Sequence, residues 1–300
     1  MKIFHFSIFR LFLFLFWIPT LPLILISQNT GEEGMPCRKT DYRCQVEILS
    51  KQIKSNPKQA QPYINRSLAY FMLREYDKAI KDCDKAIELD PKSHVAFYNR
   101  GECYRRKKNY EKAFTDFARA IELKPDFDSA YNNRGVAYSD LKKYDQAIID
   151  FNKAIELKIP NYIAYNNRGA AYRDMGNLER ALADLNKAIE LNGSYADPYY
   201  NRAVAYEMKG DDEQAVADFS KAIELNLYFV LAYNKRGLIY YKKGEYSNAI
   251  KDFNTAVALN EKYKDAYKNR ALAYEKIGER KKATADLKKY EKLNKQESDN

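Results

Sequence analysis

Apolar residues recur three and four positions apart along most of the chain, which is the spacing of one face of an α-helix. The pattern repeats every 34 residues without insertion, and repeats one to seven begin at residues 60, 94, 128, 162, 196, 230 and 264. Positions 4, 8 and 11 of each repeat form a stripe of an aromatic residue, a small residue and Tyr, and positions 20, 24 and 27 form a second stripe that begins with Ala. A small residue between large ones lets a second helix approach closely. Each repeat is therefore predicted to be a hairpin of two antiparallel helices.

These positions resemble the pattern of the tetratricopeptide repeat (TPR) family. That pattern has an aromatic residue, a small residue, Tyr, Ala and Pro at positions 4, 8, 11, 20 and 32, and repeat two carries Phe97, Gly101, Tyr104, Ala113 and Pro125 there. The resemblance implies an all-α fold, a right-handed superhelical α-solenoid of antiparallel hairpins, and a role in binding other proteins. Position 32 loses its proline after repeat two, which we expect to soften local packing without changing the fold.

The first residues of the chain differ from all that follow. Leu11 to Ile26 is charge-free and almost wholly apolar, and Lys2 and Arg10 precede it. A run of this length suits a secretory signal better than a bilayer span, which needs about 20 residues. Residues 1–27 are predicted to be a signal peptide or, alternatively, an uncleaved signal anchor. In both cases the repeats are expected on the non-cytosolic side, either exported (secreted, periplasmic or in the secretory-pathway lumen) or membrane-anchored. The alternative is that the apolar start is not used for export and the repeats act in the cytosol.

The repeat frame gives the remaining boundaries. Residues 28–40 are a linker, residues 41–59 a capping helix that corresponds to the second half of a repeat, and residues 298–300 a tail. Terminal caps of this kind are what a stacked array requires. The seven repeats occupy residues 60–93, 94–127, 128–161, 162–195, 196–229, 230–263 and 264–297.

The chain has four cysteines, and their places suggest different roles. Cys37 and Cys44 either form a small disulfide loop in an oxidising compartment or are two unrelated thiols. Cys83 and Cys103 lie inside repeats and are expected to be buried small hydrophobic residues.

The positive charge of the chain does not indicate nucleic-acid binding. The whole chain has a formal net charge of +10, and residues 60–300 carry +6 of it, with basic and acidic residues interleaved at helical spacing. Such a surface is typically solvated and paired with itself rather than a phosphate-binding stripe. We expect no nucleic-acid partner, and contact with a membrane only through the N-terminal segment.

The sequence offers little for catalysis. It has only two histidines, His5 and His94, no glycine-rich phosphate loop, and no stretch outside the repeats that is long enough for a catalytic domain. We predict that the protein is not an enzyme and has no catalytic residues, metal site or cofactor.

Two charged positions recur in every repeat. Position 7 is Arg and position 23 is Asp throughout, and an Arg facing the partner helix needs a buried acceptor that the Asp of that helix can supply. An internal ion pair in each hairpin is predicted, with a basic ladder for acidic ligands as the alternative. The predicted pairs are Arg66 with Asp82, Arg100 with Asp116, Arg134 with Asp150, Arg168 with Asp184, Arg202 with Asp218, Arg236 with Asp252, and Arg270 with Asp286.

Position 6 is Asn in all repeats except the sixth, which has Lys235. The resemblance to the TPR family implies that this position faces the concave groove, and a side-chain amide can donate to and accept from any peptide group. The predicted peptide-binding ladder consists of Asn65, Asn99, Asn133, Asn167, Asn201 and Asn269. The alternative is that Asn is a tolerated polar residue on an exposed face. Asn132, Asn166 and Asn234, at position 5, are interpreted as products of repeat copying.

The predicted function is a non-enzymatic scaffold that holds an extended segment of a partner protein in the concave groove through the Asn ladder. The alternative is a structural adaptor that assembles an envelope or secretory-pathway complex with its convex or terminal surfaces. The identity of the protein or peptide partner and the oligomeric state stay open at this level.

Overall fold

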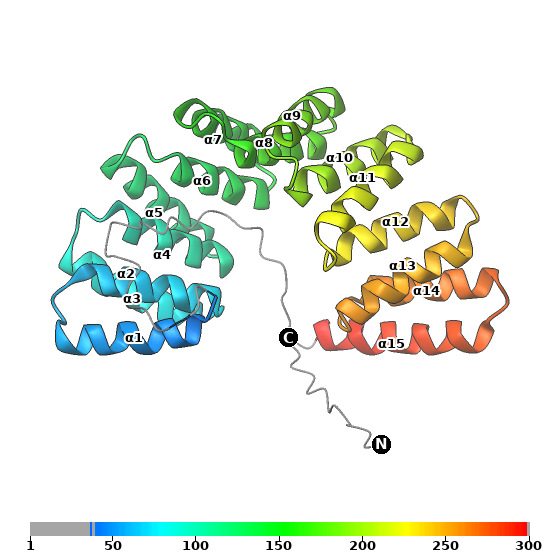
Figure 1. Cartoon of the computed structure of the whole chain (residues 1–300), viewed down its shortest axis with the longest axis horizontal. Helices are drawn as coiled ribbons and strands as arrows, with labels where there is room; N and C mark the ends of the chain where they lie inside the picture. Colours follow the sequence, from blue (N-terminus) through cyan, green and yellow to red (C-terminus); the bar gives the residue numbers. More distant parts are fainter. Residues whose placement is uncertain (1–36, 38–39, 299–300) are drawn as a thin grey trace, which may run out of the picture. The chain divides into compact units, whose positions relative to one another are not determined.

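The computed structural model describes residues 37 and 40–298. The predicted signal or anchor, most of the predicted linker and the last two residues lie outside this part. Fifteen α-helices and no strand occupy the described residues, with the helices following one another in tandem pairs (Figure 1). The predicted all-α solenoid of helical hairpins is confirmed.

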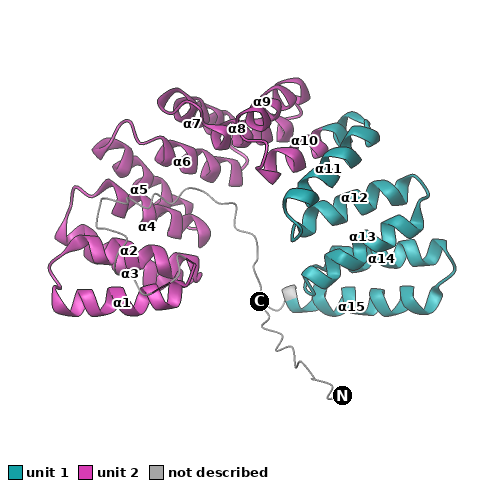
Figure 2. Ribbon diagram, viewed as in Figure 1, with its two compact units in different colours: residues 1–19, 206–300 teal, residues 20–205 magenta. Residues whose placement is uncertain are grey.

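The chain divides into two compact bodies (Figure 2). The described part of the N-terminal body ends at Ala205, and the C-terminal body begins at Tyr206, within one helix. The N-terminal body holds α1 (Tyr42–Ser55), α2 (Ala60–Met72), α3 (Tyr76–Leu89), α4 (His94–Arg106), α5 (Tyr110–Leu123), α6 (Asp128–Asp140), α7 (Tyr144–Leu157), α8 (Tyr162–Asp174), α9 (Leu178–Leu191) and most of α10 (Ala196–Lys209). The C-terminal body holds the end of α10, α11 (Asp212–Leu225), α12 (Val230–Lys242), α13 (Tyr246–Leu259), α14 (Lys264–Lys276) and α15 (Arg280–Ser298).

Close contact between the two helices of a hairpin depends on the small residue at position 8. In repeat three, a Cβ atom built on Gly135 would lie 2.7 Å from Cε1 of Phe151 on the facing helix. Phe151 and Ala147 are fully buried, as are the equivalent Phe117 and Ala113 of repeat two. The apolar stripes predicted from the sequence therefore meet in the interior of these hairpins.

The turn between the two helices of a repeat needs a left-handed residue at position 15. Gly176 has φ of 81° in repeat four, whereas Lys142 has φ of 58° at the same place in repeat three. Glycine reaches this region without a Cβ clash, so the lysine turn is the more strained of the two.

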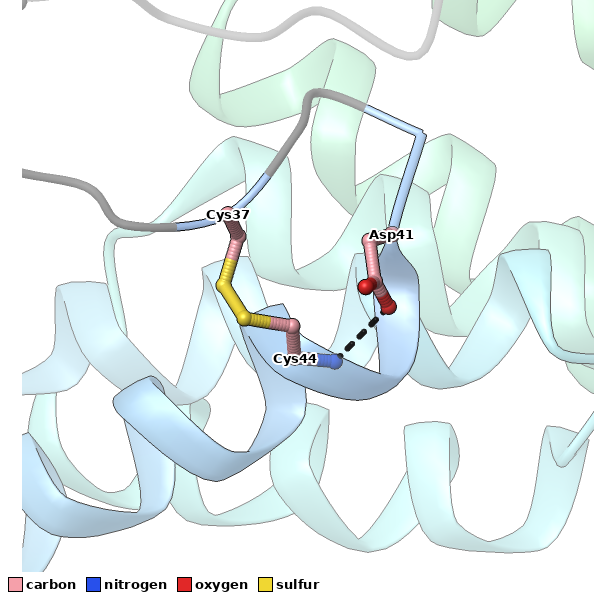
Figure 3. The surroundings of a disulfide bond; sticks show 3 residues. All are labelled: Cys37, Asp41 and Cys44. Atoms are coloured by element: carbon pink, nitrogen blue, oxygen red, sulfur yellow. Dashed lines mark hydrogen bonds between the residues drawn. A yellow bond between two sulfur atoms is a disulfide. The ribbon is translucent and has the colours of Figure 1, made fainter.

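The N-terminal end of the array is closed by α1. A disulfide joins Cys37 to Cys44 in the first turn of α1, with a Cα–Cα distance of 5.8 Å, and the Asp41 side chain caps the helix by accepting from the Cys44 backbone N–H at 3.1 Å (Figure 3). The disulfide interpretation of these cysteines is thus the correct one. Cys83 and Cys103 are buried free thiols, as predicted.

Within the described residues, none of the helices combines the length and apolar character needed to cross a bilayer.

Candidate functional site

The Arg at position 7 and the Asp at position 23 form a bidentate pair inside the hairpin. Arg66 donates from Nε and Nη2 to the two carboxylate oxygens of Asp82, both at 2.7 Å. This hydrogen bonding, opposed by burial, raises the pKa of Arg66. The same two bonds, at 2.6–2.8 Å, occur in Arg100–Asp116, Arg134–Asp150, Arg168–Asp184, Arg236–Asp252 and Arg270–Asp286.

The seventh predicted pair, Arg202 with Asp218, belongs to repeat five. Arg202 donates to Asn186 at 2.6 Å, and Asp218 is 6% exposed. The six bidentate pairs neutralise the guanidinium charge within their hairpins, which does not favour a free basic ladder for acidic ligands.

A third hydrogen bond from the Arg joins successive repeats. Its Nη1 donates to the side chain 16 residues earlier, which lies on the second helix of the preceding repeat. For Arg66 that acceptor is Ser50 of α1, at 2.9 Å, so α1 replaces the missing second helix in this contact. The remaining acceptors are Asp84, Asn152, Asn186, Ser220 and Asn254. Sequence reasoning missed this contact, although the polar residues at position 25 were a visible signal.

The predicted Asn ladder divides by burial. Asn65 is exposed, and Asn167, Asn201 and Asn269 are half-buried. Asn99 is 7% exposed and Asn133 is fully buried. The expectation that these last two residues face a ligand is therefore corrected, because a buried amide has no surface to offer a peptide.

Five asparagines of the N-terminal body form a continuous chain of side-chain hydrogen bonds, which we call the amide chain. Its members lie on α6, α8 and α10, and each Nδ2 donates to the next Oδ1. The sequence of donation runs from Asn201 to Asn166 at 2.9 Å, to Asn167 at 3.2 Å, to Asn132 at 2.9 Å and to Asn133 at 3.2 Å. The amide chain thus connects the first helices of three successive repeats.

Charged groups at both ends set the direction of the amide chain. Arg173, which can only donate, gives a hydrogen bond to Asn201 Oδ1 at 2.6 Å. At the other end Asn133 Nδ2 donates to the Tyr98 hydroxyl at 2.9 Å and to the Glu102 carboxylate at 3.4 Å. Because a guanidinium has no acceptor and a carboxylate has no donor, every amide between them must point the same way.

Glu102 is a buried carboxylate held by two arginines. It is 1% exposed, accepts two bonds from Arg105 and one from Arg106, all at 2.8 Å, and Arg105 also donates to Asp140 at 2.7 Å. Burial opposes ionisation, but the charges and hydrogen bonds of Arg105 and Arg106 outweigh it and lower the pKa of Glu102. Sequence reasoning missed this cluster, although a charged residue stands here at position 9, where five of the other repeats have Leu or Val.

The interpretation of position 5 as a product of copying is wrong. Asn132, Asn166 and Asn234 are each 4% exposed, and each accepts a hydrogen bond from the position-6 Asn of the following repeat. In the C-terminal body Asn269 donates to Asn234 at 2.9 Å, and Lys235 forms an ion pair with Glu207 at 2.9 Å. The doubled asparagines therefore link repeats.

The half-buried members keep hydrogen-bonding capacity. Asn167 uses one N–H on Asn132 and one oxygen lone pair on Asn166, and Asn201 uses one of each on Asn166 and Arg173. A primary amide has two N–H groups and two lone pairs, so one donor and one acceptor remain on each side chain.

Comparisons with known proteins agree with this architecture. Several solved structures match its fold. PilW, a widely conserved type IV pilus biogenesis factor, is 22% identical with a TM-score of 0.61, and the match covers 68% of this chain and 94% of PilW. A tetratricopeptide repeat protein from Parabacteroides merdae is 20% identical with a TM-score of 0.60, covering 78% of this chain and 93% of that one.

A chain of the APC/C Cut9–Hcn1 hetero-tetramer gives a TM-score of 0.70 at 15% identity. The match covers 78% of this chain and only 46% of that chain, so this protein spans less than half of its length. At these identities the likeness establishes the fold alone.

The family is established by sequence models. The model described as tetratricopeptide repeat matches residues 60–93, 94–127, 129–158 and 196–227, and the model described as TPR repeat matches residues 169–210 and 237–278. Together they cover well over half of the chain, which belongs to the tetratricopeptide repeat family. No curated protein matches its sequence. The family is one of protein-binding scaffolds.

Proposed function

We propose that the protein binds an extended segment of a partner protein along its first helices, through the half-exposed asparagines of the amide chain. The observation that carries this proposal is the unused donor and acceptor on Asn167 and Asn201. A peptide group also presents one N–H and one C=O, so it can pair with such a side chain irrespective of sequence. Asn65 and Asn269 are the corresponding accessible side chains in repeats one and seven.

The internal bonds of the amide chain support ligand binding in two ways. They hold Asn167 and Asn201 in one orientation in the free protein. Binding of a ligand therefore costs less side-chain conformational entropy than it would if these side chains were mobile. Each amide is also polarised by the next, from the Arg173 end to the Glu102 end, which strengthens the remaining donors and acceptors.

The structural-adaptor function is the second candidate, and α15 favours it. This terminal helix carries seven Lys or Arg against three Asp or Glu, and Lys281, Lys288 and Lys292 are exposed on it. The second helices of the other repeats hold no excess of basic residues. The terminal surface is thus chemically distinct from the rest of the array and suits an acidic partner surface.

Two multiple variants separate these functions. Partner capture by crosslinking from the native source would be compared for the wild type, Asn167→Ala with Asn201→Ala, and Lys281→Gln with Lys288→Gln and Lys292→Gln. Loss of the partner only in the asparagine variant supports groove binding, and loss only in the lysine variant supports the adaptor. If an asparagine variant with an unchanged circular dichroism spectrum keeps its partner, groove binding through the amide chain is wrong.

We also propose that the repeats act on the non-cytosolic side of a membrane. The apolar run Leu11 to Ile26 and the Cys37–Cys44 disulfide support this, since disulfides persist in oxidising compartments. Protease added to intact cells would digest cytosolic repeats only after lysis, whereas protease added to sealed secretory-pathway vesicles would digest cytosolic repeats at once and lumenal repeats only after lysis. If the repeats stay undigested in a preparation whose non-cytosolic face the protease reaches, the non-cytosolic location is wrong.

A further inference from the structure

Repeat three lacks the contact by which the other arginines reach the preceding repeat. Arg134 makes both bonds to Asp150, at 2.7 and 2.8 Å, but the residue 16 positions earlier is Ala118, which has no side-chain acceptor. Among the described residues Nη1 of Arg134 has no hydrogen-bond partner, and the side chain is 23% exposed. A guanidinium N–H group is thus available at the surface.

A second departure lies on the facing helix of the same repeat. Ile149, at position 22 on α7, is 67% exposed. The other repeats have Lys, Thr or Ala at this position, namely Lys81, Thr115, Ala183, Ala217, Lys251 and Ala285. Repeat three is therefore alone in presenting a branched aliphatic side chain there.

The two departures meet at one surface hollow. Arg134 and Ile149 line a hollow of about 350 Å³ together with Tyr131, Asp150, Asn152, Lys153 and Glu156. The four charged side chains of the hollow form two ion pairs. Arg134 binds Asp150 at 2.7 Å, and Lys153 binds Glu156 at 2.8 Å. What remains unused is the Nη1 donor of Arg134 beside the apolar surface of Ile149 and Tyr131.

Repeat two shows what a guanidinium in this position accepts. Arg100 binds Asp116 with two bonds and holds a second carboxylate, Asp84, at 2.6 Å through Nη1. Arg134 has the first of these partners and lacks the second. A carboxylate forms a stronger, charge-assisted bond than a neutral acceptor, which matters for a ligand that is not covalently tethered in place.

We propose that this hollow binds a segment of a partner protein in which a carboxylate adjoins a branched aliphatic side chain. The carboxylate takes the place that Asp84 occupies beside Arg100, and the aliphatic group covers Ile149. A polyanion such as nucleic acid does not fit, because Nη1 of Arg134 is a single unused donor that suits one carboxylate, and each further phosphate would lie against Asp150 and Glu156 without a donor of its own. The site is independent of the amide chain and is formed by α6 and α7.

The test is a titration followed by nuclear magnetic resonance of the arginine side chains and isoleucine methyl groups. The probes are N-acetyl-Leu-Asp-amide, which carries a side-chain carboxylate, and N-acetyl-leucine, which carries a terminal one. We expect saturable shifts at Arg134 and Ile149 with a Kd on the order of 1 mM for at least one probe. The stronger probe identifies whether a side-chain or a terminal carboxylate is preferred.

Two substitutions copied from other repeats remove the site without disturbing the fold. Ala118→Asn introduces the acceptor that Arg168, Arg202 and Arg270 already have, and Ile149→Lys introduces the residue found at 81 and 251. Each is expected to weaken probe binding about tenfold or more. Ala118→Asn should also raise the melting temperature, so a loss of binding in this variant cannot come from unfolding.

Two controls make the result decisive. Ser50→Ala frees Nη1 of Arg66 in repeat one, where position 22 is Lys81, and should not create a comparable site. Equal binding at Arg66 in that variant would show that the hollow and Ile149 are not needed. The proposal is overturned if neither probe shifts Arg134, if Ala118→Asn leaves the affinity unchanged, or if the neutral N-acetyl-Leu-Asn-amide binds as well as its acidic counterpart.

Discussion

Repeats three and four share the sequence Ala-Tyr-Asn-Asn-Arg-Gly, yet the structure gives these residues different surroundings. Asn133 is fully buried and donates to Tyr98 and Glu102, whereas its counterpart Asn167 is half-buried and donates to Asn132. The difference comes from the preceding repeat, which has Tyr98 at position 5 in one case and Asn132 in the other. In a stacked array, the role of a residue therefore depends on its neighbour as well as on its own repeat.

The arginines of the two copies differ for the same reason. Arg168 donates to Asn152 on the second helix of repeat three, at 2.5 Å, but Arg134 has only Ala118 before it. All three guanidinium nitrogens of Arg168 donate a hydrogen bond, whereas Nη1 of Arg134 donates none within the described residues. Identical motifs thus provide a structural link in one repeat and a candidate binding group in the next.

The largest expected effect comes from removing the partner of each arginine. Asp150→Ala leaves Arg134 without any acceptor, whereas Asp184→Ala leaves Arg168 its bond to Asn152. Breaking a buried pair costs about 3 to 5 kcal/mol, and we expect Asp150→Ala to be the more destabilising of the two. Urea unfolding followed by circular dichroism measures both. Equal midpoints would show that the third bond contributes no stability.

A pH dependence is expected from Asp197, a buried aspartate that, unlike Asp150, forms no ion pair within the part of the chain that the structure describes. Asp197 is 7% exposed, its Oδ1 has no partner, and burial raises its pKa to about 7, partly offset by a hydrogen bond from Tyr195. Because this value lies above the unfolded value of about 3.9, the folded state holds the proton more tightly and stability falls as pH rises towards 7 and slightly beyond.

Between pH 5 and pH 8 this single group should lower the free energy of unfolding by about 2 to 3 kcal/mol. Asp197→Asn should remove that part of the slope and stabilise the protein at pH 8. Thermal unfolding of both proteins at the two pH values tests the expectation. An unchanged slope in the variant would assign the pH dependence to other groups.

The two central asparagines should respond unequally to the same substitution. Asn133→Ala removes a buried donor from Tyr98 and Glu102 and is expected to cost about 1 to 3 kcal/mol. Asn167 is itself half-buried, so water can take the place of its side chain beside Asn132 and Asn166, and Asn167→Ala should cost about 1 kcal/mol or less. If binding of a partner nevertheless depends on Asn167 more than on Asn133, the surface role of Asn167 is supported. The reverse order of stabilities would contradict the burial argument.

The smallest effect is expected at the turns of the same two repeats. Lys142→Gly relieves a left-handed lysine and should stabilise repeat three by up to about 1 kcal/mol, and Gly176→Lys should destabilise repeat four by a similar amount. The melting temperatures of Lys142→Gly, Gly176→Lys and the double variant are compared with that of the wild type by thermal unfolding. Shifts of the same sign in both single variants would contradict the conformational explanation.

Much of the fold was predictable because the informative contacts lie within one repeat. The apolar stripes, the close approach at Gly135 and the acceptor for Arg134 in Asp150 all join residues at fixed spacings on two adjacent helices. The candidate site was only partly predictable. Asn167, Asn201 and Asn269 are half-buried, whereas Asn99 and Asn133 are buried, and Asn133 lies against Tyr98 of the preceding repeat, a contact that the pattern within one repeat does not contain.

By itself the sequence determined the helical hairpins and the Arg and Asp residues that pair inside six of them. Those features follow from helical periodicity and from the cost of burying an unpaired charge, both of which act over a single repeat. Only the tertiary structure decided that Asn132 and Asn166 link repeats, that Glu102 ends the amide chain, and that Nη1 of Arg134 has no acceptor. These outcomes depend on which side chains of successive helices meet and how far they exclude water, and helical periodicity within one repeat does not specify this.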